Sequence, residues 1–258
     1  MNKPYALEGV QAILAYPFKQ EGWQSKFAIG LALFFANYVI PIIPSFFLAG
    51  YFAKIMHSSI NDDESEPSLP AWDNWGDLFS RGAKVIGASL VYMLPALVLI
   101  IGGYVLAYVP LIMESISSSS NGYGETSSLS GLSVAGMMGG FGMLFLGLIL
   151  YFPLIVILPL ALTHVIAKNS FVAAFHVRTW VTIFRANFWG FVSAISIVTG
   201  VYMIAFMFAY MLYFTVILCV LMPIAMCIVY VYVGMVTGPL LGEAYRKGVA
   251  NLAEAASA

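Results

Sequence analysis

The sequence predicts an all-α integral membrane protein built from helical hairpins: four spanning helices, one re-entrant or kinked hairpin, and interfacial amphipathic helices. Of its 258 residues, 61% are hydrophobic and 9% are charged, against about 25% charged residues in ordinary soluble domains. No Asp, Glu, Lys or Arg occurs in residues 27–53, 85–113, 126–167 and 186–242. Each stretch is long enough to cross or enter a bilayer. Because these apolar runs are continuous rather than alternating, we expect helices and not a barrel.

The first apolar run, residues 27–53, is interrupted at its middle by Pro41-Ile42-Ile43-Pro44. A proline inside a helix removes a backbone donor and clashes with the preceding turn. Each half of about 13 residues would be about 20 Å long as a helix, whereas the hydrocarbon core is about 30 Å thick. We therefore expect a re-entrant hairpin, with one kinked span as the alternative.

The other apolar runs predict the four spanning helices. Residues 85–167 contain two runs separated by the Ser-rich segment Ser115–Ser130, as in a hairpin with an outer loop. The last run is about twice the length of one span and has no polar loop. We expect a tight turn within Met211–Thr215 and a kink of the second helix near Pro223.

The chain is thus predicted to be one membrane domain, residues 1–258, made of successive segments. They are an interfacial segment (1–26), the re-entrant or kinked hairpin (27–53), an acidic loop with an amphipathic helix (54–84), a hairpin with the Ser-rich loop (85–167), a second amphipathic helix (168–187), a hairpin (188–242) and a cytoplasmic tail (243–258).

Polar and apolar residues separate onto two faces between the apolar runs. In residues 72–86 the apolar positions recur at helical spacing, which predicts an amphipathic helix on the membrane surface. Residues 171–184 repeat the pattern, and residues 7–23 are a third candidate. Each segment leads into a hairpin, which suggests three repeated units. The alternative is that aromatic, basic and glycine residues recur at any membrane interface.

The positions of Lys and Arg predict the topology, since these residues concentrate on the cytoplasmic side of membranes. If residues 27–53 re-enter and the other four helices span, all eleven Lys and Arg lie on one side. A single span there would leave Lys3, Lys19 and Lys26 outside. We expect a multi-pass plasma-membrane protein with both termini in the cytoplasm. Membrane lipids are expected partners, because anionic headgroups attract basic residues.

Three motifs are similar to those of a known family. They are Tyr16-Pro17-Phe18 with Gly22-Trp23, the run Leu69-Pro70-Ala71-Trp72-Asp73-Asn74-Trp75-Gly76-Asp77-Leu78-Phe79, and Leu241-Gly242-Glu243-Ala244-Tyr245-Arg246. With these motifs, almost the whole chain resembles the prokaryotic membrane family called domain of unknown function 4013. The family favours Gln at the position of Glu243, and the Ser-rich segment is an insertion. The resemblance implies a prokaryotic membrane protein and no assigned activity.

The central motif contains the main candidate interface residues. Trp72 and Trp75 are expected to anchor the amphipathic helix at the membrane interface. Asp73 and Asp77 are expected to cap and solvate the helix, because acidic groups favour its N-terminus. These are structural roles at a surface and not catalytic ones.

Further candidates lie in and beside the third apolar run. Gly136 and Gly140 form a small-xxx-small pair, which lets another helix of the same chain or of a second copy approach closely. His164 is the histidine beside a membrane run, and ionisable groups at membrane depth are candidates for function. Its position close to Lys168 favours the cytoplasmic interface instead.

We predict no catalytic, cofactor-binding or metal-binding residues. The sequence contains no paired Asp in its apolar runs, no His-Glu-x-x-His and no Gly-x-Ser-x-Gly, which are motifs of hydrolases. The acidic cluster at residues 61–66 does not have the spacing of a calcium loop. Cys219 and Cys227, eight residues apart on one helix, are too distant to form a disulfide. The net charge of −1 argues against a nucleic-acid partner.

We therefore expect a non-enzymatic scaffold, an accessory subunit or a self-assembling membrane oligomer, with a second copy or another membrane protein as partner. The alternative is a channel or transporter that uses helices broken at Pro41–Pro44, Pro153–Pro159 and Pro223. A membrane enzyme acting on lipids would need a polar pocket that joins His164, Glu243 and Tyr245.

Overall fold

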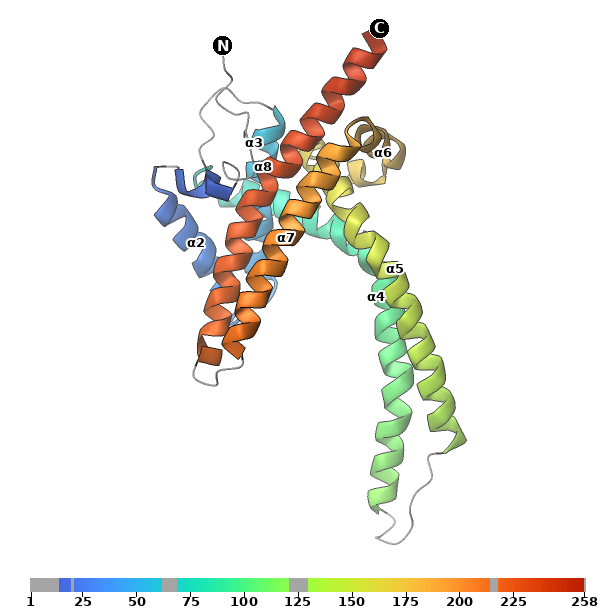
Figure 1. Ribbon diagram of the computed structural model, residues 1–258. Coiled ribbons are helices and arrows are strands. Elements are labelled where there is room, and N and C mark those ends of the chain that lie inside the picture. Colours follow the sequence, from blue (N-terminus) through green and yellow to red (C-terminus); the bar gives the residue numbers. More distant parts are fainter. Residues whose placement is uncertain (1–13, 20, 62–68, 121–129, 214–217, 258) are drawn as a thin grey trace. The chain divides into compact units, whose positions relative to one another are not determined.

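The computed structural model describes residues 14–19, 21–61, 69–120, 130–213 and 218–257. This described part of the chain is helical apart from short connections and contains no strand (Figure 1). In chain order the elements are the 3-10 helix η1 (Tyr16–Lys19), α2 (Trp23–Ala36), α3 (Ile43–Asn61), α4 (Trp75–Ser120), α5 (Gly131–Lys168), the 3-10 helix η2 (Phe171–Phe175), α6 (Val177–Ala186), α7 (Phe188–Tyr213), the 3-10 helix η3 (Leu218–Leu221) and α8 (Met222–Ser257). The predicted all-α fold class is confirmed.

Four helices are long and apolar enough to cross a membrane. They are Trp75–Ser117 in α4, Gly131–Lys168, Phe188–Met211 in α7 and Met222–Ser257. A span needs about 20 residues, and α2, with 14 residues, is shorter than that. The protein is therefore a multi-pass membrane protein, as its composition predicts.

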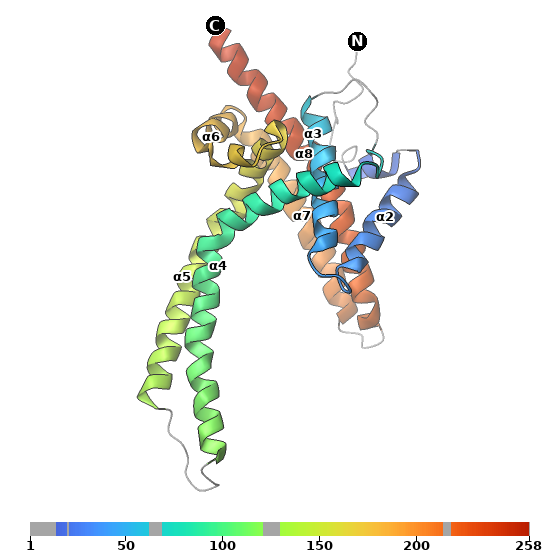
Figure 2. The same cartoon turned by 180° about the vertical axis from the view of Figure 1, so that it is seen from behind.

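The chain divides into two compact units. The first contains residues 1–88 and 159–258, and the second contains residues 89–158. The division falls inside α4 and α5, so each unit holds a part of both helices. In the second unit these parts of α4 and α5 run antiparallel, side by side (Figures 1 and 2). They form the hairpin expected within residues 85–167.

The first apolar run forms a hairpin and not one kinked helix. The chain reverses between α2 and α3, and the two helices pack against each other (Figure 2). Asn37 stabilises the reversal, because its amide donates to Leu33 O at 3.2 Å and its Oδ1 accepts from Ser45 Oγ at 2.8 Å. Ile42 adopts a φ of 77°, a left-handed conformation that is unfavourable for a β-branched residue.

The central helix of the first unit is α8, which packs against α2, α3, α6 and α7. Its residues Gly234, Gly238 and Gly242 face α3. A Cβ at Gly238 would lie 2.8 Å from Ile55 Cγ2, and a Cβ at Gly242 would lie 2.8 Å from Ser59 Cβ. This glycine spacing lets the two helices approach closely.

The last apolar run forms two helices, as predicted, but its details differ. Because α7 continues to Tyr213, the start of the turn predicted at Met211–Thr215 is helical, and residues 214–217 lie outside the described residues. Pro223 stands in the first turn of α8, where no helical hydrogen bond is lost. It therefore begins the helix instead of kinking it. The predicted tail, residues 243–258, continues α8 through Ser257 without a break.

The second amphipathic segment is not a single helix. Asn169, with a φ of 46°, ends α5, because a residue in this conformation closes a helix in a Schellman motif. The short helix η2 separates this point from α6, where Trp180 and Ile183 are buried. Of the third amphipathic candidate, residues 7–13 lie outside the described residues, and residues 16–19 form η1.

Candidate functional site

The first part of the central motif, residues 69–74, is a non-helical segment that we call the motif strap. Three of its carbonyl groups accept side-chain hydrogen bonds: Leu69 O from Lys26 Nζ, Pro70 O from Tyr51 Oη at 3.1 Å, and Ala71 O from Lys54 Nζ at 3.5 Å. A backbone carbonyl outside a helix or sheet needs such a partner when it is removed from water. Because α2 and α3 supply the donors, the motif strap is fastened to the first hairpin.

Trp72 is the packing centre of the motif strap. Its ring stacks on Tyr51 with centroids 3.8 Å apart and an interplanar angle of 5°. Its Nε1 donates to Lys26 O at 2.9 Å. Tyr51 is completely buried, in a core that includes Leu78. Trp72 therefore joins α2 and α3 within the protein, whereas Trp75 is 45% exposed and keeps a position suited to an interfacial anchor.

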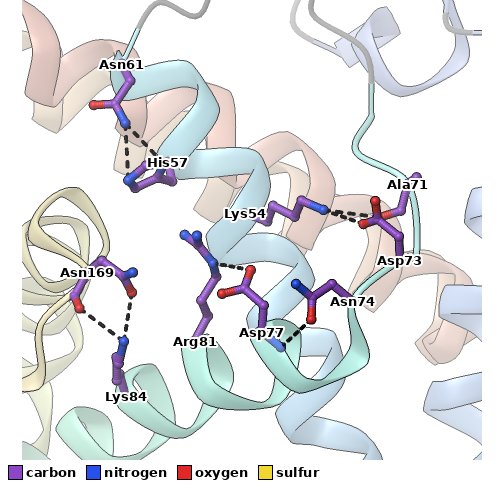
Figure 3. A network of polar contacts seen from close by, with 10 residues as sticks. All are labelled: Lys54, His57, Asn61, Ala71, Asp73, Asn74, Asp77, Arg81, Lys84 and Asn169. Atoms are coloured by element: carbon purple, nitrogen blue, oxygen red, sulfur yellow. Dashed lines mark hydrogen bonds and ion pairs between the residues drawn. The ribbon is translucent and has the colours of Figure 1, made fainter.

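Asp73 is not a helix cap but the partner of Lys54, whose Nζ lies 2.6 Å from Asp73 Oδ1 (Figure 3). The hydrogen bond from Lys54, together with its positive charge, holds the pKa of the Asp73 carboxyl below its usual value. Asn74 caps α4, since its Oδ1 accepts from the Asp77 N–H at 3.2 Å. Asp77 in turn accepts from Arg81 Nε at 2.7 Å. The helix consequently begins at Trp75 and not at Trp72.

The start of α4 crosses α3 with the two backbones in contact. A Cβ at Gly50 would overlap the carbonyl group of Leu78, and a Cβ at Gly82 would overlap the carbonyl group of Phe46. Beside the crossing, Phe79 stacks on Phe46 with ring centroids 5.0 Å apart. Since a side chain at either glycine would force the helices apart, glycine is needed at both positions. The crossing and the motif strap together form one joint between α3 and α4.

A further polar contact joins the start of α4 to the end of α5 within the first unit. Lys84 Nζ lies 3.1 Å from Asn169 O and 3.0 Å from Asn169 Oδ1 (Figure 3). Carbonyl groups at a helix C-terminus lack helical partners and carry partial negative charge. Lys84 therefore stabilises the C-terminus of α5, a role that its place in an amphipathic pattern did not indicate.

Gly136 and Gly140 lie against α4 of the same chain, in the second unit. A Cβ at Gly140 would lie 2.5 Å from Ala107 N and 2.7 Å from Gly103 O. A Cβ at Gly136 would lie 2.9 Å from Leu106 O. The helix partner that the spacing left open is thus α4, and both glycines are buried in this hairpin.

Gly140→Leu is expected to destabilise the hairpin of the second unit, and Gly142→Leu is not. The new side chain at Gly140 would meet backbone atoms, whereas no atom lies within 4 Å of a Cβ at Gly142. Overpacking of this kind costs on the order of 2 kcal/mol. Thermal unfolding of both variants in one detergent measures the difference. Equal unfolding midpoints would show that the hairpin does not pack through Gly140.

His164 is buried inside the protein, with 2% of its surface exposed. Its Nδ1 lies 2.7 Å from the hydroxyl oxygen of Tyr245 on α8. The third residue considered with this pair, Glu243, instead forms an ion pair with Lys247 at 2.7 Å. The structure thus brings together two of the three residues.

The described residues contain no group of three His, Cys, Asp or Glu side chains placed to hold a metal ion. Of the acidic cluster, residues 62–66 lie outside the described residues. Cys227 is buried in α8, in agreement with a packing role. The side chain of Cys219 is outside the described part.

Sequence patterns indicate only some of the residues that build this site. The glycines at 234, 238 and 242 have the same spacing as Gly136 and Gly140, so the contact of α8 with a neighbour was detectable. No local pattern marks Gly50 and Tyr51. Gly82 fits the apolar face of the amphipathic pattern in residues 72–86, but that pattern does not indicate its contact with α3.

Comparison with known proteins adds a family to this description. The family model described as "Protein of unknown function (DUF4013)" matches residues 33–214, which is more than half of the 258-residue chain. No curated protein and no solved structure matches the chain. The matched region contains α3, the motif strap, α4 and α5. The chain therefore belongs to the DUF4013 family of proteins of unknown function.

Proposed function

We propose that this protein is a non-enzymatic membrane protein that acts by its shape, as a scaffold, an accessory subunit or a self-assembling oligomer. The observation that carries the proposal is that residues of its most specific motif make contacts within the protein itself. Trp72 packs on Tyr51, and Asp73 pairs with Lys54. The polar groups of a catalytic motif are expected to converge on a pocket for substrate. A motif whose side chains hold one joint together supports a structural role.

The same contacts support the proposed topology, in which α2 and α3 re-enter, the four long helices span, and both termini are cytoplasmic. Lys26 on α2 and Lys54 on α3 both bond to the motif strap. These cations therefore lie at one end of the hairpin, away from the reversal at residues 37–42. Cations gathered at one end agree with the positive-inside rule, and anionic lipids of the plasma membrane are the proposed lipid partners.

A channel or transporter built on proline-broken helices is less well supported. In such proteins, discontinuous helices surround a site near the middle of the membrane. Here α5 is continuous through Pro153 and Pro159, and α8 begins at Met222 with Pro223 in its first turn. The reversal beside Pro41 is the remaining break of the three considered.

Extraction of the full-length protein from membranes in a gentle detergent tests the proposal. Native mass spectrometry is expected to find assemblies heavier than one 28.1 kDa chain, because they contain further copies or another membrane protein. The same preparation in proteoliposomes is expected to pass small ions and sugars no faster than protein-free vesicles.

Two results would contradict the proposal. One is a single chain that neither binds a partner nor changes vesicle shape. The other is solute flux that Pro41→Ala or Pro44→Ala abolishes while the variant remains folded, which would identify a channel or transporter.

A further inference from the structure

A pocket of about 400 Å³ lies in the first unit and is lined by residues from the end of α5, from α6 and from the last part of α8. Its polar lining includes His164 and Lys168 of α5, Arg178 and Thr179 of α6, and Tyr245 of α8. Among the described residues that line it there is no Asp or Glu. The pocket is therefore positively charged.

Among the described residues, neither Lys168 nor Arg178, the two cations of the pocket, has an ion-pair partner. In the part of the chain that the structure describes, the ion pairs involve Lys54, Arg81 and Lys247 and neither Lys168 nor Arg178. Both are exposed. A concave surface lined by one sign of charge concentrates ions of the opposite sign. This pocket is consequently suited to an anion.

The hydrogen-bonded pair of His164 and Tyr245 forms a polar part of the pocket lining. Tyr245 occupies His164 Nδ1 at 2.7 Å. In the described residues, a side-chain nitrogen or oxygen that lacks a hydrogen-bond partner is not buried. His164 Nε2 has no hydrogen-bond partner among these residues. Nε2 therefore keeps accessible surface, and His164 lines the pocket. When the Tyr245 hydroxyl donates to Nδ1, the proton of the neutral imidazole is on Nε2, which becomes a further donor.

We propose that this pocket binds a phosphate group, and that the phosphate belongs to the headgroup of an anionic phospholipid. Guanidinium and ammonium groups bind phosphate oxygens through charge-assisted hydrogen bonds. Ile183, Val249 and Leu252 form the apolar side of the lining, which suits the carbon chains next to a lipid phosphate. Lys168 is the last residue of a candidate span, where headgroups lie. The inference rests on the membrane assignment and not on the scaffold role.

The test compares two double variants of the full-length protein with equal change of charge. K168Q/R178Q removes the cations of the pocket, and K19Q/R185Q removes two exposed cations that do not line it. Delipidated protein in a non-ionic detergent is titrated with dioleoyl phosphatidic acid, dioleoyl phosphatidylcholine or inorganic phosphate, and binding is measured by native mass spectrometry and calorimetry. Unfolding midpoints of both variants confirm that they are folded.

Wild type and K19Q/R185Q are expected to bind phosphatidic acid more tightly than phosphatidylcholine. K168Q/R178Q is expected to bind phosphatidic acid about tenfold more weakly, because two charge-assisted contacts are lost. If wild type bound inorganic phosphate but not phosphatidic acid, and K168Q/R178Q bound neither, the pocket would still be a phosphate site. Its ligand would then be a soluble phosphate compound and not a lipid. Equal binding by the two variants, or no binding of any probe by wild type, would overturn the proposal.

Discussion

Replacing Gly82 with alanine is expected to lower the free energy of unfolding by on the order of 3 kcal/mol. The added Cβ would overlap the carbonyl group of Phe46 on α3. A backbone carbonyl cannot rotate away as a side chain can, so α3 and α4 would have to separate. Separation would also loosen the stack of Phe79 on Phe46. Thermal unfolding of the detergent-solubilised protein, followed as the fraction that stays monodisperse, measures the loss.

Gly76→Ala is the matched control, because it adds the same methyl group to the same helix. The nearest atom to a Cβ at Gly76 is Asn74 Oδ1 at 3.9 Å, an ordinary van der Waals distance. Alanine is favoured over glycine in a helix by up to about 1 kcal/mol, so this variant is expected to unfold at or slightly above the wild-type temperature. If the two variants unfolded alike, the backbones would not be in contact at Gly82.

Trp72→Ala is expected to cost about 3 kcal/mol, the low end of the range for large aromatic side chains removed from a core, because Trp72 is partly buried against the core. The substitution removes the stack on buried Tyr51 and the hydrogen bond to Lys26 O. Trp72→Phe keeps an aromatic ring and loses the hydrogen bond, which contributes about 1 kcal/mol. Unfolding of wild type and both variants in one detergent separates the two contributions.

Trp75→Ala is the control within the same motif. Trp75 is 45% exposed and meets Phe47 edge-on at a centroid distance of 5.4 Å. A smaller loss than for Trp72→Ala is expected, since less of the ring is buried. A loss at Trp75 equal to or larger than the loss at Trp72 would contradict the assignment of Trp72 as the packing centre of the motif strap.

Charge placement predicted most of the fold from the sequence. The long runs free of Asp, Glu, Lys and Arg become α5, α7 and the apolar parts of α4 and α8, because a charge in hydrocarbon is costly wherever it occurs. The reversal near Pro41 was also predictable, since the chain there is too short on either side to span. These properties are local, so they do not depend on the neighbours of a helix.

The effect of proline on the helices differs from one position in the chain to another. Two prolines in the middle of the first run accompany a reversal, whereas Pro153 and Pro159 lie within the continuous helix α5 and Pro223 lies in the first turn of α8. Prolines are tolerated in membrane helices where the freed backbone groups find other partners. Which of these outcomes occurs depends on packing around the helix and on the residues that precede it.

The central motif was identified from the sequence, but its role was not. Trp72 and Asp73 fit a helical pattern that begins before the helix does. Their partners Tyr51 and Lys54 lie on the preceding helix, α3. Many aromatic and basic residues of the chain could have been the partners of Trp72 and Asp73, so the sequence pattern could not identify Tyr51 and Lys54.

The sequence by itself determined the membrane class, the order of hairpins and the segments where charge gathers, since hydrophobicity and charge are properties of each segment alone. Only the tertiary structure decided that Gly50 and Gly82 lie in one crossing, that Gly140 faces its own hairpin, and that His164 is buried against Tyr245. Each of these depends on which face of a helix meets which neighbour. Between helices that are apolar on all sides, close packing of side chains determines which faces meet, and composition does not predict those faces.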